Sequence, residues 1–350
     1  SQSSIPVHLY TLNLAYYPHK KGPYNFDVDG TNADGSLKYP DTRWGGIMRP
    51  IQQPDFERDN IEYIEFWLMD PFVEDSTNVG GDLFFNLGDV SEDVLKDGRK
   101  SFEQGLPTPS TDNPVDTTAW GLVPLMQALV PAFDNDAESR VAQDVGYDGL
   151  STEKEREFFK AYLDSLAAKH GVNSPAYIKA YNDPSNDDYH HFRGSDYDSD
   201  NLGILERYKL YNNPEGNSPP AEFSQENYST SGKTDPNVED INRDNTLNEG
   251  ENYFQYRVSI RPQDFEVGKN YITDKVIVSS TFVNDKQSKV AWYQFKIPIH
   301  SYDKRIGNIQ DFKSIRFMRM FMTNFTADQT ILRFATLDLV VSNAGTSSVT

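Results

Sequence analysis

The chain of 350 residues contains no cysteine, which excludes disulfide bonds as a means of holding it together. It also lacks a run of about 18 apolar residues, the length that a membrane-spanning helix needs. Basic residues are few: 33 lysines and arginines face 53 aspartates and glutamates, for a formal net charge of −20. A field of that sign repels nucleic acids and anionic membranes and attracts divalent cations. We therefore expect no nucleic-acid partner and no direct membrane span in this segment.

Familiar catalytic motifs are missing as well. The sequence has no cysteine nucleophile and no HExxH, GxSxG, P-loop or GxGxxG pattern. Pairs of carboxylates are frequent, but 53 acidic residues produce such pairs by chance. We predict no catalytic residue and expect a protein that is not an enzyme.

Alternating apolar residues predict strands in two separate parts of the chain. In residues 61–69, Ile64, Phe66 and Leu68 share one face, and residues 82–88 predict a second strand. Five further aromatic or β-branched runs follow near the C-terminal end: Tyr253–Ile260, Tyr271–Val283, Lys289–Ile299, Ser314–Phe325 and Thr330–Val341. The run Ser314–Phe325 is apolar on both faces, which predicts a central strand buried on both sides, with its methionines filling the core.

Strands at short spacing, without β–α–β alternation, favour antiparallel sheets. We therefore expect a mainly β fold with an α insertion: an antiparallel β-sandwich of the jelly-roll or carbohydrate-binding-module type, built from two sequence blocks. The expected domains are a discontinuous β-sandwich of residues 1–105 and 250–350 and a helical, loop-rich insertion of residues 106–249.

The strongest helix prediction in the insertion covers residues 151–170. Thr152 and Glu155 have the spacing of a capping box, and Gly171 ends the pattern. Residues 182–249 are mostly Asn, Asp, Ser, Pro and Tyr, and so long a loop region needs a reason to be ordered.

A calcium-loop pattern occupies residues 240–251. Its ligand positions carry oxygen-bearing groups, Thr246 through its backbone carbonyl: Asp240, Asn242, Asp244, Thr246, Asn248 and Glu251. Asn245 replaces the usual glycine, and asparagine tolerates the left-handed backbone that this position requires. A strand pattern follows where a helix would be expected. The two interpretations are a structural calcium site, which we favour, and a solvated acidic loop.

A weaker match to the same pattern lies in residues 144–155. Asp144, Asp148, Leu150 and Glu155 are its candidate ligands, and the predicted helix is the expected continuation. Gly146 stands at position 3 and supplies no ligand. The alternative is a turn and a helix start without a metal.

The stretch of residues 182–201 is rich in aspartate and has two adjacent histidines. Adjacent histidines point apart, so a shared transition-metal site is not expected. A further calcium site is one interpretation, and a hydrated loop is the one we favour. The candidate ligands are Asp183, Asp187, Asp188, Asp196 and Asp198.

Aromatic side chains raise a different possibility, because sugar rings stack on them in carbohydrate-binding modules. The candidates are Tyr63, Trp67, Trp120 and Trp292. Tryptophan in an alternating strand more often belongs to the core, so this is the alternative function: a carbohydrate-binding-module-like domain that recognises surface glycan. A glycan-active enzyme is a third and weaker candidate.

Several long phrases carry a family resemblance. They are YYPHKKGPYNFD (16–27), RWGGIMRPI (43–51), NIEYIEFWLMDPF (60–72), GGDLFFNLGDVSEDVLKDGR (80–99), DVGYDGLS (144–151) and EDINRDNTLNE (239–249). Together they resemble the SprA/Sov family of gliding-motility and secretion proteins of Bacteroidetes. Members of that family are very large outer-membrane β-barrels that form the translocon of the type IX secretion system.

The resemblance implies that this chain is a soluble segment of such a protein, outside the barrel wall. Its implied partners are other translocon subunits, secreted client proteins and the parent barrel of the same chain. We expect an outer-membrane protein with this segment on the cell-surface side, where calcium is abundant; the periplasmic side is the alternative. The implied function is a non-enzymatic structural and interaction domain. The calcium-loop patterns add Ca²⁺ as the expected cofactor.

Overall fold

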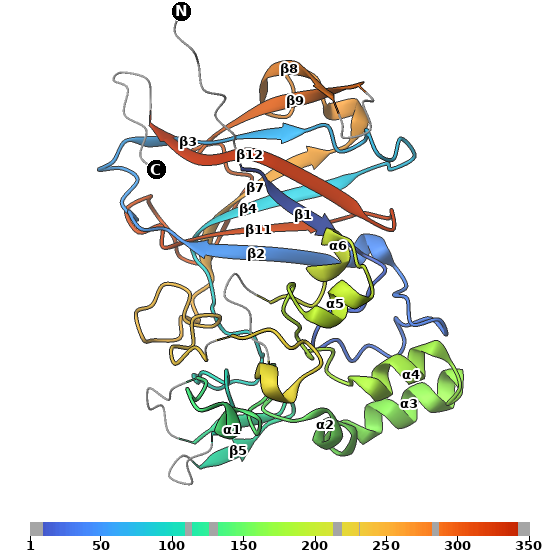
Figure 1. Cartoon of the computed structure of the whole chain (residues 1–350). Helices are drawn as coiled ribbons and strands as arrows, with labels where there is room; N and C mark the ends of the chain where they lie inside the picture. The colour runs from blue at the N-terminus through green and yellow to red at the C-terminus, as the bar shows by residue number, and fades with distance from the viewer. Residues whose placement is uncertain are drawn as a thin grey trace, which may run out of the picture. The chain divides into compact units, whose positions relative to one another are not determined.

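A computed structural model describes residues 10–108, 114–125, 132–212, 219–230, 232–281 and 287–341 (Figure 1). The chain forms two compact units. The sandwich unit comprises Ser1–His19, Tyr39–Val90 and Glu251–Thr350, and the second unit comprises Lys20–Lys38 and Ser91–Gly250.

The sandwich unit contains two antiparallel sheets of five strands. The first has the order β1 (Leu12–Tyr16), β12 (Thr330–Val341), β3 (Ile61–Met69), β9 (Gln287–Pro298) and β8 (Ile272–Thr281). The second has the order β10 (Lys304–Ile306), β7 (Asn252–Ile260), β4 (Gly81–Asp89), β11 (Phe317–Thr323) and β2 (Trp44–Pro50). The expected antiparallel β-sandwich is confirmed. The last two residues of the predicted run Tyr271–Val283 lie outside the described residues.

Both sequence blocks contribute to both sheets. In the first sheet β3 pairs with β12 and β9, and in the second β4 pairs with β7 and β11. A strand from the N-terminal block is therefore hydrogen-bonded on each side to strands of the C-terminal block. This pairing explains why two parts of the sequence so far apart form one sandwich.

The core lies between the two sheets, and Phe66 of β3 is at its centre. Its side chain is 0% exposed. Its ring centroid lies 4.7 Å from that of Phe295 in the same sheet and 5.5 Å from that of Phe85 in the opposite sheet. The alternation of β3 places Ile64, Phe66 and Leu68 in this core, as the sequence predicts.

Strand β11 differs from the expectation that both of its faces are buried. Met318, Met320 and Met322 do fill the core. The opposite face is only half-buried at Arg319 and Phe321, and the Phe321 ring stacks on Phe84 of β4 at 4.9 Å. An arginine and a stacked aromatic pair cover this face without a second apolar layer.

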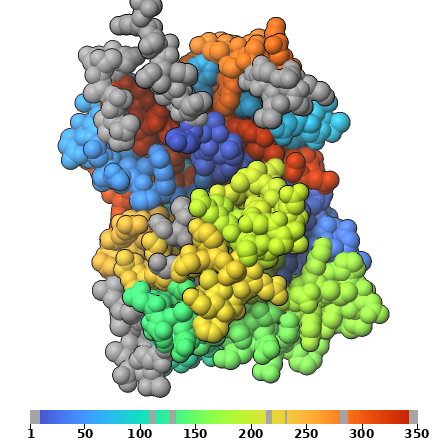
Figure 2. Space-filling view, in the orientation of Figure 1, coloured from blue at the N-terminus to red at the C-terminus, as the bar shows by residue number. Residues whose placement is uncertain are grey.

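The second unit is built mostly of short elements. These are β5 (Val115–Thr117), β6 (Leu122–Pro124), α1 (Ala137–Arg140), α2 (Thr152–Phe158), α3 (Lys160–His170), α4 (Pro175–Asn182), α5 (Ser195–Ser199), α6 (Ile204–Arg207) and a 3-10 turn at Ala221–Phe223. Yellow-green α5 and α6 belong to the surface seen in Figure 2. The clustered apolar core among its described residues is small: Leu163, Leu166 and Ala180.

The segments 20–38 and 91–105 cluster with the second unit, whereas the sequence assigned them to the sandwich. Polar contacts hold them there: Tyr24 bonds to Asp187, and Glu92 accepts from the backbone of Ile241. Hydropathy patterns do not report such contacts. The domain ranges 1–105, 106–249 and 250–350 stay a prediction from the sequence.

The predicted helix of residues 151–170 is interrupted at Phe159, whose backbone (φ −94°, ψ 25°) separates α2 from α3. The predicted capping box is wrong. Ser151 is the N-cap and makes no side-chain cap bond, while the Glu155 carboxylate accepts the backbone N–H of Ser185 instead. Gly171 ends α3 in the left-handed region (φ 85°), as expected.

Candidate metal centre

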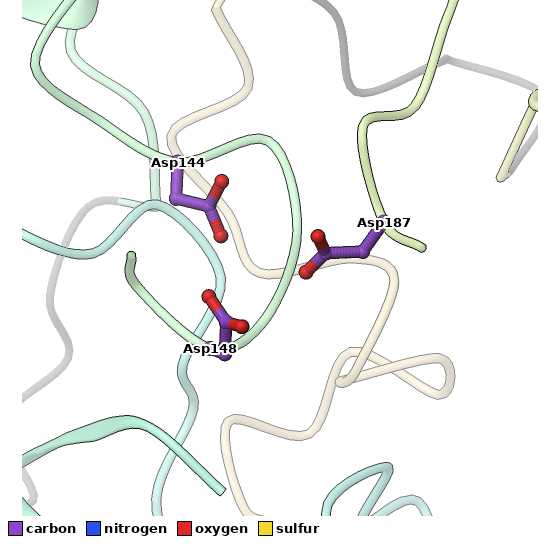
Figure 3. A group of neighbouring side chains, drawn as sticks. All are labelled: Asp144, Asp148 and Asp187. Carbon is purple, nitrogen blue, oxygen red and sulfur yellow. The ribbon is translucent and has the colours of Figure 1, made fainter. Parts of the chain in front are cut away.

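Acidic side chains from distant parts of the sequence converge inside the second unit. Asp144 and Asp148 lie in the turn between α1 and α2, and Asp187 follows α4. One carboxylate oxygen from each lies within 4.8 Å of those from the other two. Figure 3 shows the three carboxylates directed toward a common space.

A second group overlaps the first. Glu155 of α2, Asp183 at the end of α4 and Asp187 again bring one oxygen each to within 4.8 Å of one another. Asp187 is therefore common to both groups. We call the set Asp144, Asp148, Glu155, Asp183 and Asp187 the carboxylate centre.

Ser185 fixes two of these carboxylates. Its hydroxyl donates to Oδ2 of Asp148, and its backbone N–H donates to Oε2 of Glu155 at 3.0 Å. The N–H of Leu150 donates to Oδ1 of Asp148 at 2.9 Å. One residue thus links the turn of Asp148 to helix α2 and holds both acidic groups in place.

Tyr24 orients Asp187. Its hydroxyl donates to Oδ2 of Asp187 at 2.8 Å and accepts the N–H of Tyr147 at 2.7 Å. The N–H of Asp187 in turn donates to Oδ1 of Asp183 at 3.1 Å. Tyr24 and Asp183 therefore both fix the position of Asp187, the residue common to the two groups.

Gly146 provides the room for Asp187. A Cβ atom at this position would lie 1.8 Å from Oδ2 of Asp187, closer than any real contact allows. In the calcium-loop pattern Gly146 stands where a ligand is missing. The carboxylate of Asp187, from a segment about forty residues later in the sequence, fills the space that its absent side chain leaves.

Four of the five carboxylates in the centre are buried. Asp148 and Glu155 are 0% exposed, Asp187 is 1% and Asp144 is 9%. Of the buried side-chain atoms that lack a hydrogen-bond partner in the described residues, three belong to the centre: Oδ2 of Asp144, Oε1 of Glu155 and Oδ1 of Asp187. A buried polar atom without a partner is costly, and a buried unpaired charge is more so. These atoms are therefore available to a ligand.

The pKa values of the buried carboxylates in the centre are raised as well. Burial, and then repulsion from the neighbouring carboxylates, raises the pKa of Asp144 and of Asp187 well above the usual range. Burial raises the pKa of Asp148 to about 6 and that of Glu155 to about 8. Carboxylates this close and this dry cannot all be ionised without a cation.

Lys21 brings one positive charge to the centre. Its ammonium donates to the carbonyl of Pro184 at 2.9 Å and interacts with the charges of Asp183, Glu155 and Asp187. Burial lowers the pKa of Lys21 to about 8, against the pull of those carboxylates. One ammonium cannot balance the whole set.

The donor atoms of the centre are carboxylate oxygens. Hard cations such as Ca²⁺, Mg²⁺ and Mn²⁺ prefer oxygen, whereas soft metals select thiolate or imidazole. Calcium accepts six to eight oxygens in variable geometry. The donor set therefore fits calcium.

The structure brings together most of the weaker predicted site. Asp144, Asp148 and Glu155 all belong to the carboxylate centre, while Leu150 contributes its N–H to Asp148. Asp183 and Asp187, candidates from the third stretch, join them. Asp188 accepts from Thr152, Asp196 bonds to His190 at 2.8 Å and Asp198 pairs with Arg207 at 2.8 Å.

The residues of the stronger predicted loop make other contacts. Asp240 accepts the N–H groups of Asp244 (3.0 Å) and Asn245 (2.9 Å), and Asp244 accepts that of Thr246 at 3.0 Å. Asn245 is left-handed (φ 63°), as the pattern requires. In the other unit, both oxygens of Glu251 accept from Arg319 at 2.9 Å. Calcium binding by Asp240, Asn242, Asp244, Thr246, Asn248 and Glu251 stays a prediction.

Glu92 organises that loop and was missed from the sequence. Its side chain is 3% exposed, and it accepts the N–H groups of Ile241 (2.8 Å), Asn242 (3.3 Å) and Asn248 (3.3 Å). Burial raises its pKa, and these backbone donors oppose the rise. A single glutamate far away in the sequence gives no signal of this role.

The four aromatic candidates for sugar stacking are half-buried: Tyr63, Trp67, Trp120 and Trp292. Lys296 places its ammonium 4.4 Å from the centroid of the Tyr63 ring, which covers one stacking face. Glycan recognition by these residues stays a prediction.

A sequence model for a family described as motility related/secretion protein (SprA_N) matches residues 161–344, just over half of the chain. No curated protein matches the chain. Among the described residues, no helix combines the length and the apolar character needed to cross a bilayer. The matched family is one of secretion and motility proteins, and it is not an enzyme family. The chain therefore belongs to the SprA/Sov family of motility-related and secretion proteins.

Proposed function

We propose that this chain is a non-enzymatic structural and interaction segment of an outer-membrane translocon for type IX secretion and gliding motility, and that calcium orders its second unit. Its partners are other translocon subunits and secreted client proteins. The family match supports the secretion role. The observation that carries the calcium role is the set of buried carboxylates with oxygens that lack hydrogen-bond partners.

The composition of the second unit supports a need for ions. The apolar cluster among its described residues comprises Leu163, Leu166 and Ala180, its other buried apolar residues, such as Leu106 and Phe133, lie outside that cluster, and the chain has no disulfide. Ordering a chain segment costs roughly 1–2 kcal/mol per residue in backbone entropy. Calcium bound only by the folded state offsets part of that cost.

The cell-surface side of the outer membrane is the location that we propose. Calcium is abundant outside cells, and weak extracellular sites with dissociation constants of about 10⁻⁴–10⁻³ M are filled there. The strongly negative charge of the chain favours the same cation.

A secretion assay in the native cells tests this proposal. The full-length protein with both Asp144→Asn and Asp187→Asn should secrete several-fold less protein into the medium and reduce gliding. Asp200→Asn, an exposed aspartate of the same acidic stretch, is the matched control and should leave both unchanged. Protease added to intact wild-type cells should cut this segment.

Two outcomes would contradict the proposal. Normal secretion by cells whose protein has lost calcium binding would remove the link between calcium and secretion. Protection of the segment until the outer membrane is broken would assign it to the periplasmic side.

A further inference from the structure

We infer that the carboxylate centre binds two divalent cations, with Asp187 as the ligand that bridges them. This inference rests on the proposed calcium role and adds to it the number of ions and the residue that joins them.

The geometry contains two overlapping groups of three carboxylates that share one member. Asp144 and Asp148 complete one group with Asp187, and Glu155 and Asp183 complete the other. A carboxylate has two oxygens with about four lone-pair positions. Asp187 can therefore accept the Tyr24 hydroxyl and still contribute an oxygen to each of two ions.

The oxygens without partners are distributed over both groups. Asp144, whose Oδ2 lacks a partner, belongs to the first group, Glu155, whose Oε1 lacks one, belongs to the second, and Asp187, whose Oδ1 lacks one, belongs to both. One ion beside Asp144 and Asp148 would leave the Glu155 oxygen unsatisfied. Two ions provide a partner for each of these buried oxygens.

The balance of charge also favours two ions. One divalent ion among five carboxylates, of which four are buried and Asp183 is half-buried, would leave three negative charges. Two ions leave one negative charge, and the ammonium of Lys21 matches it. Buried charges persist only when they are paired or coordinate a metal. The two-ion state is the one in which all five carboxylates are ionised and compensated.

Each ion needs ligands besides these carboxylates. Three carboxylates per site fall short of the six to eight oxygens that calcium takes, so backbone carbonyls and water complete the shell. Gly146 leaves the room that the Asp187 carboxylate occupies, because any Cβ there would collide with it.

Counting bound ions in single variants of the full chain tests the inference. Equilibrium dialysis with calcium, read by metal analysis, compares wild type with Asp187→Asn, Asp144→Asn, Asp183→Asn and the Asp200→Asn control. Asp187→Asn should lose two ions per chain, the two single-site variants one each, and the control none. Any ion held by the loop of residues 240–251 is common to all samples and cancels in the difference.

The possible failures are distinguishable. If Asp187→Asn loses only one ion, the bridged pair is wrong while the proposed calcium role survives. If Asp187→Asn loses none, both are wrong.

Folding of each variant is checked by circular dichroism in chelator, where removal of one of several repelling charges should not destabilise the protein.

A second measurement avoids variants that fail to fold. Wild-type protein loaded with Mn²⁺, which accepts the same oxygen ligands, should give the electron paramagnetic resonance signal of an exchange-coupled pair. A spectrum of isolated Mn²⁺ ions at saturation would overturn the bridged arrangement.

Discussion

Buried carboxylates in this protein have different kinds of partners. Asp82 of the sandwich unit is 3% exposed and pairs with Arg257 at 2.7 Å and Arg261 at 2.6 Å. Burial opposes its ionisation, but these hydrogen bonds outweigh it and lower the pKa of Asp82. Glu103 and Glu239 of the second unit, each 1% exposed, instead bond to one another. A pair of acids without a nearby cation must share a proton.

The Glu103–Glu239 pair makes stability depend on pH. Burial, and then the charge of Glu239, raises the pKa of Glu103 far above the ordinary value of 4.5. The folded state therefore keeps a proton that the unfolded state releases above about pH 4.5, so stability falls as pH rises, by at most about 1.4 kcal/mol per pH unit.

Glu103→Gln should remove this dependence, because an amide can donate to Glu239 without titrating. We expect a higher free energy of unfolding for the variant near pH 8, and a smaller advantage near pH 5, in urea titrations with chelator present. Glu157→Gln, at an exposed position of α2, is the control. A variant less stable than wild type at pH 8 would show that Glu103 is not the proton-holding member of the pair.

Residue patterns predicted the members of the carboxylate centre only in part. Asp144, Asp148 and Glu155 follow a local spacing, so the sequence could suggest them. Asp187 joins them through the chain path after α4 and through the empty space at Gly146, which no local pattern encodes. Glu92 is in the same situation, because its partners lie about 150 residues away.

At the scale of elements, strands were predictable and helix details were not. The period-two alternation of Ile64, Phe66 and Leu68 reflects burial between two sheets, which the structure confirms. The predicted capping box is wrong because the Glu155 carboxylate accepts the N–H of Ser185 and belongs to the carboxylate centre. Local spacing cannot foresee a tertiary partner of that kind.

Strand β3 supplies the element-scale prediction. Phe66→Ala should lower the free energy of unfolding of the sandwich unit by about 3–5 kcal/mol, because it removes a fully buried ring among packed aromatics. Trp44→Ala on edge strand β2, where the side chain is 72% exposed, should change it by less than about 0.5 kcal/mol. Urea unfolding followed by circular dichroism measures both. A loss below about 1 kcal/mol for Phe66→Ala would be inconsistent with its central place in the core.

Across the whole molecule, the two units differ in what holds them. The sandwich unit has an extended apolar core between its sheets. Both groups of candidate metal ligands found in the described residues belong to the second unit, which has a small apolar cluster. The sequence predicts a different source of order for its long polar insertion, because the chain is acidic and has no cysteine.

The central claim is that calcium orders the second unit through the carboxylate centre, and thermal unfolding of the full chain tests it most directly. At calcium about 100-fold above its dissociation constant, the stabilisation is about 2.7 kcal/mol, or roughly 5–10 °C for a unit of this size. Wild type and Asp200→Asn should show this rise over samples in chelator. Asp187→Asn should show little or none, although in chelator it should be at least as stable as wild type. Identical unfolding curves for the wild type in calcium and in chelator would contradict the account.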